Sequence, residues 1–286
     1  MGLKLIAAGW TDSGRERENN EDTIFHLVVQ DATGEPLGLF IVCDGVGGQL
    51  AGDQASQMAV AAIRDSLRDL FAPPDEFQTQ PLEILHTPFL NPRVPPASDT
   101  RPMNRAMPGD SLRQRVVAAA QIGNLSVFGL TRHKPEEAGN AGTTLTMALV
   151  RGSHAIVANV GDSRTYLIRD GHLQRVTKDH SLIEGLIDSG NVKPEERFTH
   201  PARNVILRSL GRDTKVDVDI FEESLRQGDI LLLCSDGLWE MVRDPDEIAA
   251  LARRAATPLQ ACRDLISAAN AAGGSDNISV IVVRIE

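Results

Sequence analysis

The sequence predicts an α+β sandwich, and three observations support that fold class. Apolar segments of strand length recur along the chain, and several alternate with polar residues or are rich in β-branched residues. Helical periodicity is confined to two separate blocks of the chain. The resulting order is strands, helices, strands, helices and a last strand, which differs from the regular strand–helix alternation of a parallel sheet.

Each expected element follows from its own pattern. Several apolar segments end at glycine or aspartate, as strands that lead into turns do. In chain order the expected strands cover Leu3–Trp10, Thr23–Val29, Leu37–Cys43, Thr144–Val150, Ala155–Val160, Thr165–Ile168, Asp229–Cys234 and Ile278–Ile285. Apolar residues at helical spacing predict helices over Gln54–Leu70, Leu112–Leu130, Asp246–Ala255 and Leu259–Ala271.

The segment from Phe71 to Asp110 differs from the rest because it holds more than half of the chain's 15 prolines. Proline at this density can continue neither a helix nor a central strand. We therefore expect one domain over residues 1–286 with a Pro-rich, extended insertion at about 71–110. A linker between two domains is the weaker alternative, because the first 70 residues are too few for a core of their own.

Composition excludes several classes of protein. The chain has 286 residues, of which 42% are hydrophobic and 24% charged, the profile of a soluble globular protein. No run of about 18 apolar residues occurs, so no membrane-spanning helix is expected. Lysine and arginine number 29 and aspartate and glutamate 39, which gives a net charge of −10. That charge argues against nucleic acid as the main partner.

Cysteine usage and the N-terminus favour a cytoplasmic protein. Cys43, Cys234 and Cys262 are odd in number, widely spaced and without a CxxC pair, so neither a disulfide framework nor a zinc knuckle is expected. The first ten residues lack the features of a secretory signal. A myristoylation motif at Gly2 would need serine or threonine where Ile6 stands.

Acidic residues mark five separate strand ends, in most cases beside a glycine. They are Glu21 and Asp22 before the second expected strand, Asp44 after the third, Asp162 after the fifth, Asp236 after the seventh and Asp276 before the last. Any one of these aspartates taken alone would be a turn former. Jointly they indicate a shared site, because so many carboxylates at one sheet edge would repel one another without a cation.

Hard divalent cations fit such a set of acids. Mg²⁺ and Mn²⁺ prefer oxygen ligands, and a pair of these ions needs several carboxylates to converge. Glycine beside an acid lets the backbone approach closely, so that a carbonyl oxygen can serve as a further ligand. The sequence therefore predicts a divalent-metal site at one edge of the sandwich.

Six short motifs occur in a fixed order. They are Arg17-Glu18-Asn19-Asn20-Glu21-Asp22, Asp44-Gly45-Val46-Gly47-Gly48, Gly142-Thr143-Thr144, Gly161-Asp162-Ser163-Arg164, Ser235-Asp236-Gly237-Leu238-Trp239 and Ser275-Asp276-Asn277. Together they resemble the motifs of the metal-dependent protein serine/threonine phosphatases (PPM, or type 2C), in particular the bacterial branch. The resemblance runs from about Leu5 to Val283 and is interrupted only by the Pro-rich insertion. Six motifs in register are far more specific than any one of them.

The resemblance implies a fold and an activity. The expected fold is a four-layer α-β-β-α sandwich of two antiparallel sheets flanked by helices, with the metal site at one edge. The expected activity is hydrolysis of phosphoserine and phosphothreonine on proteins, by direct attack of a water that bridges two divalent ions. The implied cofactors are Mn²⁺ or Mg²⁺, with two core ions and a third, weaker one. The implied partners are phosphorylated proteins, substrates of a partner serine/threonine kinase; no nucleic acid, no membrane and a monomer are expected.

The resemblance also assigns roles to individual residues. The implied metal ligands are Asp22, Asp44, the Gly45 carbonyl, Asp236 and Asp276 for the core pair, and Asp162 for the third ion. Glu21 would hold a metal-bound water. Arg17 matches the arginine that holds the substrate phosphate, a task for which a planar and permanently charged guanidinium is suited. Judged from its charged neighbours alone, Arg17 would be a solvated surface residue.

One departure from the animal members concerns the general acid. They carry a histidine just after the Asp-Gly pair, where Val46 stands here. Protonation of the leaving group must then come from a metal-bound water or from a residue that the sequence does not identify. Residues 182–210 correspond to the family's flap beside the active site, and their glycines and prolines predict a loop-rich segment that contacts substrate.

Several residues beside these motifs are expected to be structural. His180 is expected to make structural hydrogen bonds, since it has no metal-ligand spacing with another histidine. Cys43 and Cys234 are expected in the core, although they stand next to proposed ligands. Asp229 is expected to be a turn residue only.

Competing functions fit the sequence less well. A cysteine nucleophile would need an arginine six residues on, where Gln49, Glu240 and Ala268 stand. An aspartyl-phosphate motif would need threonine or valine where Phe221 stands. The alternative of another class is a catalytically silent PPM-fold binding or scaffold module. Such degenerate members usually lose ligand acids, and every expected acid is present here.

Overall fold

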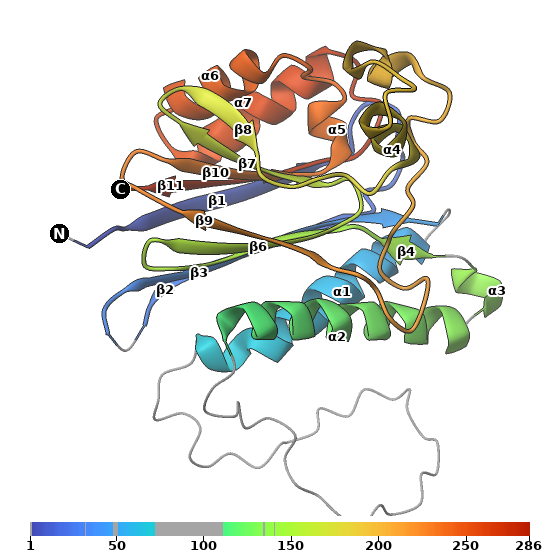
Figure 1. The fold of residues 1–286 in the computed structure, drawn as a ribbon, viewed down its shortest axis with the longest axis horizontal. Helices are drawn as coiled ribbons and strands as arrows, with labels where there is room; N and C mark the ends of the chain where they lie inside the picture. The colour runs from blue at the N-terminus through green and yellow to red at the C-terminus, as the bar shows by residue number, and fades with distance from the viewer. Residues whose placement is uncertain (1, 32, 48–50, 72–110, 134, 140) are drawn as a thin grey trace, which may run out of the picture.

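Two antiparallel sheets face each other, and helices cover the outer face of each sheet (Figure 1). The computed structural model describes all residues except 1, 32, 48–50, 72–110, 134 and 140. The Pro-rich insertion predicted at about 71–110 lies outside the described residues, apart from Phe71. The predicted four-layer α-β-β-α sandwich is confirmed.

All eight expected strands are present. The first sheet has the order β1 (Leu5–Asp12), β11 (Ile278–Ile285), β10 (Ile230–Cys234), β7 (Arg164–Arg169) and β8 (His172–Arg175). The second has the order β2 (Asp22–Gln30), β3 (Pro36–Val46), β5 (Leu145–Arg151), β6 (His154–Val160) and β9 (Asp219–Ser224), with β4 (Gly142–Thr143) paired to the end of β3. The strands β4, β8 and β9 were not predicted, because two are very short and β9 carries three acidic residues.

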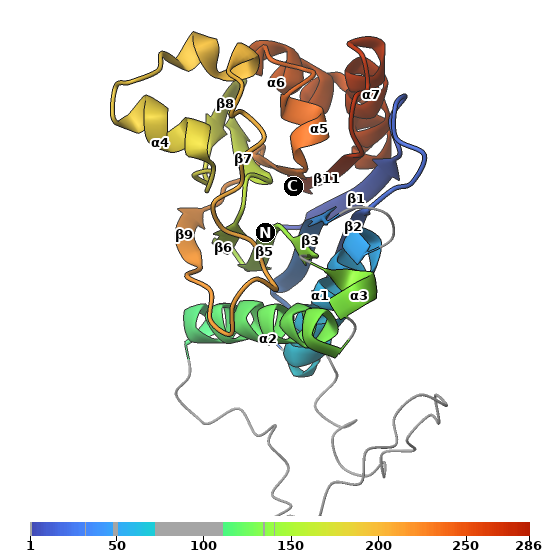
Figure 2. The same ribbon diagram turned by 90° about the vertical axis from the view of Figure 1, so that its right-hand side faces the viewer.

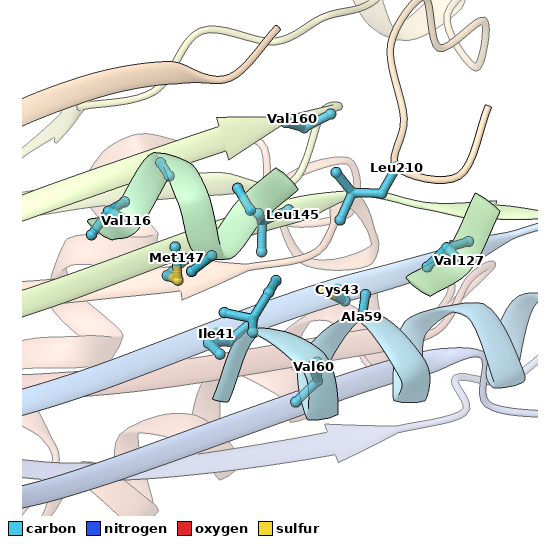
Figure 3. Close-up of a cluster of buried hydrophobic side chains, with 14 of the residues drawn as sticks. Ile41, Cys43, Ala59, Val60, Val116, Val127, Leu145, Met147, Val160 and Leu210 are labelled. Carbon is cyan, nitrogen blue, oxygen red and sulfur yellow. The ribbon is translucent and has the colours of Figure 1, made fainter. Parts of the chain in front are cut away.

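Alternation along the central strands builds the layers. In β3, Ile41 and Cys43 pack against the helical layer, whereas Phe40 and Val42 point into the space between the sheets. Figure 3 shows Ile41 and Cys43 beside residues of the two covering helices. Successive side chains of a strand point to opposite faces, so a strand buried on both faces reads as a continuous apolar run. The acidic motifs at Asp44 and Asp236 therefore come at the end of continuous apolar runs, in β3 and after β10.

The helices confirm the predicted periodicity. The second sheet is covered by α1 (Ala51–Leu67) and α2 (Leu112–His133), and the first by α6 (Pro245–Arg254) and α7 (Pro258–Ala271). The side chains of Asp244 and Thr257 cap α6 and α7, and each of these helices has a proline at its first position. Among the helices of the described residues, none combines the length and apolar character needed to cross a membrane.

The expected flap is more regular than predicted. Residues 182–210 begin with a helix, α4 (Leu182–Asp188), and continue through a 3-10 helix, η2 (Pro194–Thr199). The Oγ of Ser181 accepts a hydrogen bond from the backbone N–H of Glu184 and caps α4. Gly185 suggested a loop, but one glycine inside a helix costs only about 1 kcal/mol, which burial of Ile183 offsets. The remaining short helices are η1 (Arg68–Leu70), α3 (Pro135–Ala138) and α5 (Asp236–Trp239).

Candidate active site

Strand register brings acids from both sheets to one edge of the sandwich. Asp22 begins β2 and lies directly opposite Asp44 in β3. Asp236 follows β10 in the other sheet and begins α5. Asp162 lies in the turn between β6 and β7, and Asp276 lies in the turn before β11. The carboxylates that the sequence placed at separate strand ends therefore share one end of the molecule.

A cleft of about 410 Å³ lies at this edge. The neighbouring elements α5 and β4 are at the right of Figure 1, the end that faces the viewer in Figure 2. Seven of the eight predicted site residues line the cleft: Arg17, Glu21, Asp44, Gly45, Asp162, Asp236 and Asp276. The eighth, Asp22, is buried with 8% of its surface exposed. The cleft is also lined by Asn204, Ile206 and Asn277, to which the sequence analysis gave no role.

Two polar residues hold the acidic loops in place. The Oγ of Ser235 donates to Oδ2 of Asp22 over 2.8 Å and accepts from the backbone N–H of Ser279. Asn277 accepts from the backbone N–H of Glu21 over 2.8 Å, and its amide donates to the carbonyl oxygens of Ser13 and Asn19. Both Ser235 and Asn277 lie inside quoted motifs, which is the signal that could have identified them. They tie acids of one sheet to those of the other.

Close backbone approach explains a glycine of the Asp44 motif. A Cβ atom at Gly45 would overlap the carbonyl of Gly52 in α1 and would lie 2.7 Å from the carbonyl oxygen of Glu21. Only glycine therefore fits between the end of β3 and the start of α1. The backbone N–H of Gly45 donates to the Glu21 carbonyl over 3.2 Å, which fixes the two segments together.

The carboxylates are strongly perturbed by burial and by one another. Burial raises the pKa of Asp22 to about 6, and burial together with the neighbouring Asp179 raises the pKa of Asp162 to about 7. Burial, followed by repulsion from neighbouring aspartates, raises the pKa values of Asp44 and Asp236 well above the usual range. An acid whose charged form is disfavoured in this way lacks a compensating positive charge.

Carboxylate oxygens without a hydrogen-bond partner also indicate a cation site. Within the described residues, one buried carboxylate oxygen each of Asp22, Asp162 and Asp236 has no hydrogen-bond partner. No group of three or more histidine, cysteine or acidic side chains among the described residues is placed around one point. Magnesium-type sites need no such cluster, because each ion takes one or two carboxylates and completes its shell with carbonyl oxygen and water. The donor set, all oxygen and partly unsatisfied, therefore fits hard divalent cations.

Arg17 is the cationic residue at the mouth of the cleft. Its Nη2 donates to Oδ2 of Asp276 over 2.8 Å, and 57% of its side chain is exposed. Asp276, and more weakly Asp236 and Asp44, raise the pKa of the Arg17 guanidinium. The structure thus places Arg17 against the acids and not at a remote surface position.

A buried ion-pair network supports the Asp162 turn. Arg164 donates from Nε and Nη2 to the two oxygens of Asp179 over 2.9 and 2.6 Å, and its guanidinium lies 3.4 Å from the centre of the Trp239 ring. The indole N–H of Trp239 donates to the carbonyl oxygen of Asp162 over 3.1 Å. Arg197 of η2 also donates to Asp179 over 3.0 Å, so the flap joins the same network. These roles could not be predicted from the sequence, because the partners lie in separate segments of the chain.

We expect replacement of Arg164 by methionine to lower the free energy of unfolding by about 3 kcal/mol, because it leaves part of a buried ion pair uncompensated. The pair is almost fully buried, with side-chain exposures of 8% for Arg164 and 0% for Asp179. Urea unfolding followed by circular dichroism measures the change. The control is Arg113→Met, which removes an exposed pair with Glu222 and should cost no more than about 1 kcal/mol. Equal losses in both variants would contradict the role assigned to the network.

The structure confirms most of the residues expected to be structural and corrects one. The Nδ1 of His180 accepts from the backbone N–H of Gly161 over 3.1 Å, as expected of a structural histidine. Cys43 and Cys234 are fully buried in the core. Asp229 is more than a turn residue, because it is 2% exposed and accepts two hydrogen bonds from Arg169. Its burial beside β7 could not be read from its own segment.

The fold and the site together define a class of protein. Two face-to-face antiparallel sheets, helical outer layers and an acid-lined cleft at one sheet edge are the features of a metal-dependent phosphatase. The protein phosphatase 2C family model matches residues 14–271. The chain therefore belongs to the protein phosphatase 2C family and is a serine/threonine protein phosphatase.

Relatives of known function and structure agree with this membership. The chain is 33% identical over 276 residues to the serine/threonine phosphatase stp of Listeria monocytogenes, and the match covers 96% of this chain and 93% of the relative. The crystal structure of the Mycobacterium tuberculosis serine/threonine phosphatase PstP/Ppp superposes with a TM-score of 0.75 at 31% identity, over 100% of both chains. A PstP catalytic domain in complex with two manganese ions gives a TM-score of 0.74 at 30% identity, over 99% of both.

Proposed function

We propose that this phosphatase hydrolyses phosphoserine and phosphothreonine with two divalent cations held in the acid-lined cleft. The proposed ligands of the pair are Asp22, Asp44, the Gly45 carbonyl, Asp236 and Asp276. The observation that carries the proposal is the group of buried, mutually repelling carboxylates with unpartnered oxygens in the described residues. The two manganese ions named for the PstP catalytic domain support the number of core ions and their class.

Bound cations would supply Lewis-acid chemistry, by lowering the pKa of water and offsetting the negative charge of the phosphoryl oxygens. The chain's own residues bind and orient the substrate. Arg17 offers two parallel N–H donors to the phosphoryl oxygens, and its exposed position lets it exchange Asp276 for a phosphate. Glu21, whose pKa is raised chiefly by burial, lies where its carboxylate can orient a water. These contacts position the ester for in-line attack without a covalent intermediate.

We propose that the general acid is not a histidine. Val46 occupies the wall position next to Gly45, and no histidine is found among the described residues that line the cleft. We propose that water protonates the leaving hydroxyl. Serine and threonine alkoxides are strong bases, so a solvent proton donor within an open cleft can serve them.

We propose a third, more weakly held ion at Asp162. Its carboxylate has one buried oxygen that finds no partner within the described residues. Asp162 comes from a different turn than the ligands proposed for the core pair, and its carbonyl is fixed by Trp239. A site in which a single carboxylate binds the cation holds it less tightly than a site with several carboxylate ligands.

The biological setting is also part of the proposal. We propose that the substrates are proteins phosphorylated by a partner serine/threonine kinase and that the protein acts as a monomer. The 1–286 chain is proposed to form one phosphatase domain, since segments before and after the Pro-rich insertion together build both sheets. Either Mn²⁺ or Mg²⁺ suits the oxygen ligands, and relative activity with each ion ranks them.

The test is phosphate release from a phosphothreonine peptide. We expect activity with Mn²⁺ that falls by at least about 100-fold in excess EDTA and returns on re-addition of metal, because several kcal/mol of catalysis depend on the cations. Isothermal titration calorimetry of the metal-free protein gives the number of bound ions independently of turnover. Activity that survives EDTA would overturn the metal site. Metal binding without activity on any peptide would favour the scaffold function.

A further inference from the structure

A second pocket of about 560 Å³ adjoins the active-site cleft. Val46, Asn204 and Ile206 line both cavities, so the two form one groove. The groove leads from the acids toward the C-terminal end of α2 and the segment that precedes β9. When the phosphorylated side chain of a polypeptide substrate enters the acidic cleft, the residues on either side of it lie on the surrounding surface. This groove offers a continuous path for them.

The floor between the two cavities is held by backbone hydrogen bonds. Gly45 and Val46 of β3 pair with Thr143 and Gly142 of β4. Thr143 in turn exchanges two hydrogen bonds with Leu210, over 3.2 Å from its N–H and over 2.8 Å to its carbonyl. These hydrogen bonds tie the segment that continues to Arg212 to the strand that carries Asp44 and Gly45.

Two arginines lie in this second pocket. Arg212 follows Leu210 and Gly211, and the fully buried Asn124 of α2 holds this turn by accepting from the N–H of Gly211 and donating to the carbonyl of Asp213, both over 2.9 Å. Arg132 comes from the last turn of α2, with its guanidinium 5.0 Å from the centre of the Phe128 ring. Both side chains are exposed. Asn124 holds the backbone on either side of Arg212, and the guanidinium of Arg132 lies over the Phe128 ring.

The charge of the pocket is opposite to that of the cleft. None of the described residues that line the second pocket is acidic, whereas the cleft is lined by several carboxylates. The chain as a whole has a net charge of −10, whereas the described lining of this pocket carries two arginines and no acid. Guanidinium groups bind carboxylates and phosphates through paired N–H donors. The groove is therefore complementary to a peptide that carries a negative side chain near its phosphorylated residue.

We propose that Arg132 and Arg212 form a specificity subsite that binds an anionic side chain of the substrate polypeptide, near the phosphorylated residue. The inference depends on the phosphatase activity and adds a preference among its substrates. The anion is a carboxylate or a second phosphate, which share the same recognition chemistry. The subsite contributes to peptide binding and takes no part in the chemical step, because Arg132 and Arg212 line the second pocket and not the cleft that holds the proposed metal ligands.

The test compares peptides that differ in one flanking residue. A series of phosphothreonine peptides carries a single aspartate, or the matched asparagine, at each position within about five residues of the phosphothreonine, and a second series carries a further phosphothreonine. We expect kcat/KM to rise by about two- to fivefold for acidic residues at the position that reaches the pocket, the effect of one exposed ion pair. A larger effect in the second series would assign the subsite to phosphate, a larger effect in the first series would assign it to carboxylate, and equal effects would show that it accepts both anions.

Variants separate the subsite from catalysis. The double variant Arg132→Ala and Arg212→Ala should lose the acidic preference and retain wild-type activity on p-nitrophenyl phosphate, which has no flanking residues. Replacing both arginines with glutamate should favour lysine-flanked peptides. The matched control is Arg254→Ala, an exposed arginine at the end of α6.

Two outcomes would overturn the subsite without touching the phosphatase function. They are a wild-type enzyme that treats acidic and neutral peptides alike, and an acidic preference that survives the double variant. Absence of activity on p-nitrophenyl phosphate and on every peptide would instead contradict the phosphatase function itself.

Discussion

Replacement of Asp44 with asparagine is expected to lower kcat/KM by at least about 1,000-fold, because several kcal/mol of transition-state stabilisation are lost and each 1.4 kcal/mol corresponds to about tenfold. Asp44 lies opposite Asp22 across β2 and β3 and lines the cleft. Asparagine keeps the shape of the side chain but loses the charge that a divalent cation requires. Phosphate release from a phosphothreonine peptide in saturating Mn²⁺ measures the effect.

The fold of the Asp44→Asn variant should persist. Asp44 is surrounded by other acids, and both burial and Asp22 raise its pKa. Removing one negative charge from this group should therefore leave the metal-free protein at least as resistant to heat as the wild type. Differential scanning calorimetry in EDTA tests this expectation. A lower melting temperature together with lost activity would mean that Asp44 is needed for folding and would leave its role as a ligand unsupported.

The control for this variant is Asp65→Asn on the exposed face of α1, where the carboxylate forms an exposed pair with Arg64. It makes the same chemical change far from the cleft and should leave kcat/KM within twofold of the wild-type value, as surface substitutions usually do. Full activity of Asp44→Asn, or equal loss in both variants, would contradict the proposed metal site. Calorimetric Mn²⁺ titration of Asp44→Asn should show weakened binding.

Replacement of Arg17 with alanine is expected to lower kcat/KM by about 100-fold, the loss of two charge-assisted hydrogen bonds of roughly 1.5 kcal/mol each. Arg17 lines the cleft and donates to Asp276 in the absence of substrate. A phosphate bound beside the proposed ligands would attract the same guanidinium. Steady-state kinetics with a phosphothreonine peptide measures kcat and KM separately.

Two further variants distinguish phosphate binding from general electrostatics. Arg17→Lys keeps the charge but loses the planar fork, so its kcat/KM should lie between those of wild type and Arg17→Ala. Arg15→Ala removes an exposed charge of the same sign two residues away and should have little effect. Equal losses in Arg15→Ala and Arg17→Ala would show that both arginines act through the surface field alone. Metal affinity should not fall in Arg17→Ala, because the variant removes a positive charge from beside Asp276.

The layers of the fold could be predicted because burial constrains the residue types within each short segment. A strand covered on both faces needs apolar residues throughout, as β3 and β10 have, and an amphipathic helix needs apolar residues at regular spacing. The strands β8 and β9 escaped prediction because β8 has only four residues and β9 carries three acidic residues, so neither shows a clear apolar pattern.

Contacts between distant segments were not predictable in the same way. The β7–β8 hairpin returns the chain so that Asp179 reaches Arg164. The position of η2 then places Arg197 against the same carboxylate. Arg132 and Arg212 are 80 positions apart in the chain. Asn124 brings the Arg212 turn onto α2, a contact that no local pattern records.

Eight strands, the amphipathic helices and the identity of the acids could be predicted from the sequence, because hydrophobic periodicity and strand-end motifs are properties of short segments. The three-dimensional arrangement was needed to show that Asp22 and Asp44 lie side by side, that Ser235 and Asn277 link the two sheets, and that two arginines adjoin the cleft. Strand register and the packing of the two sheets fix the relative positions of these residues. Both depend on contacts among residues far apart in the chain, which no single segment specifies.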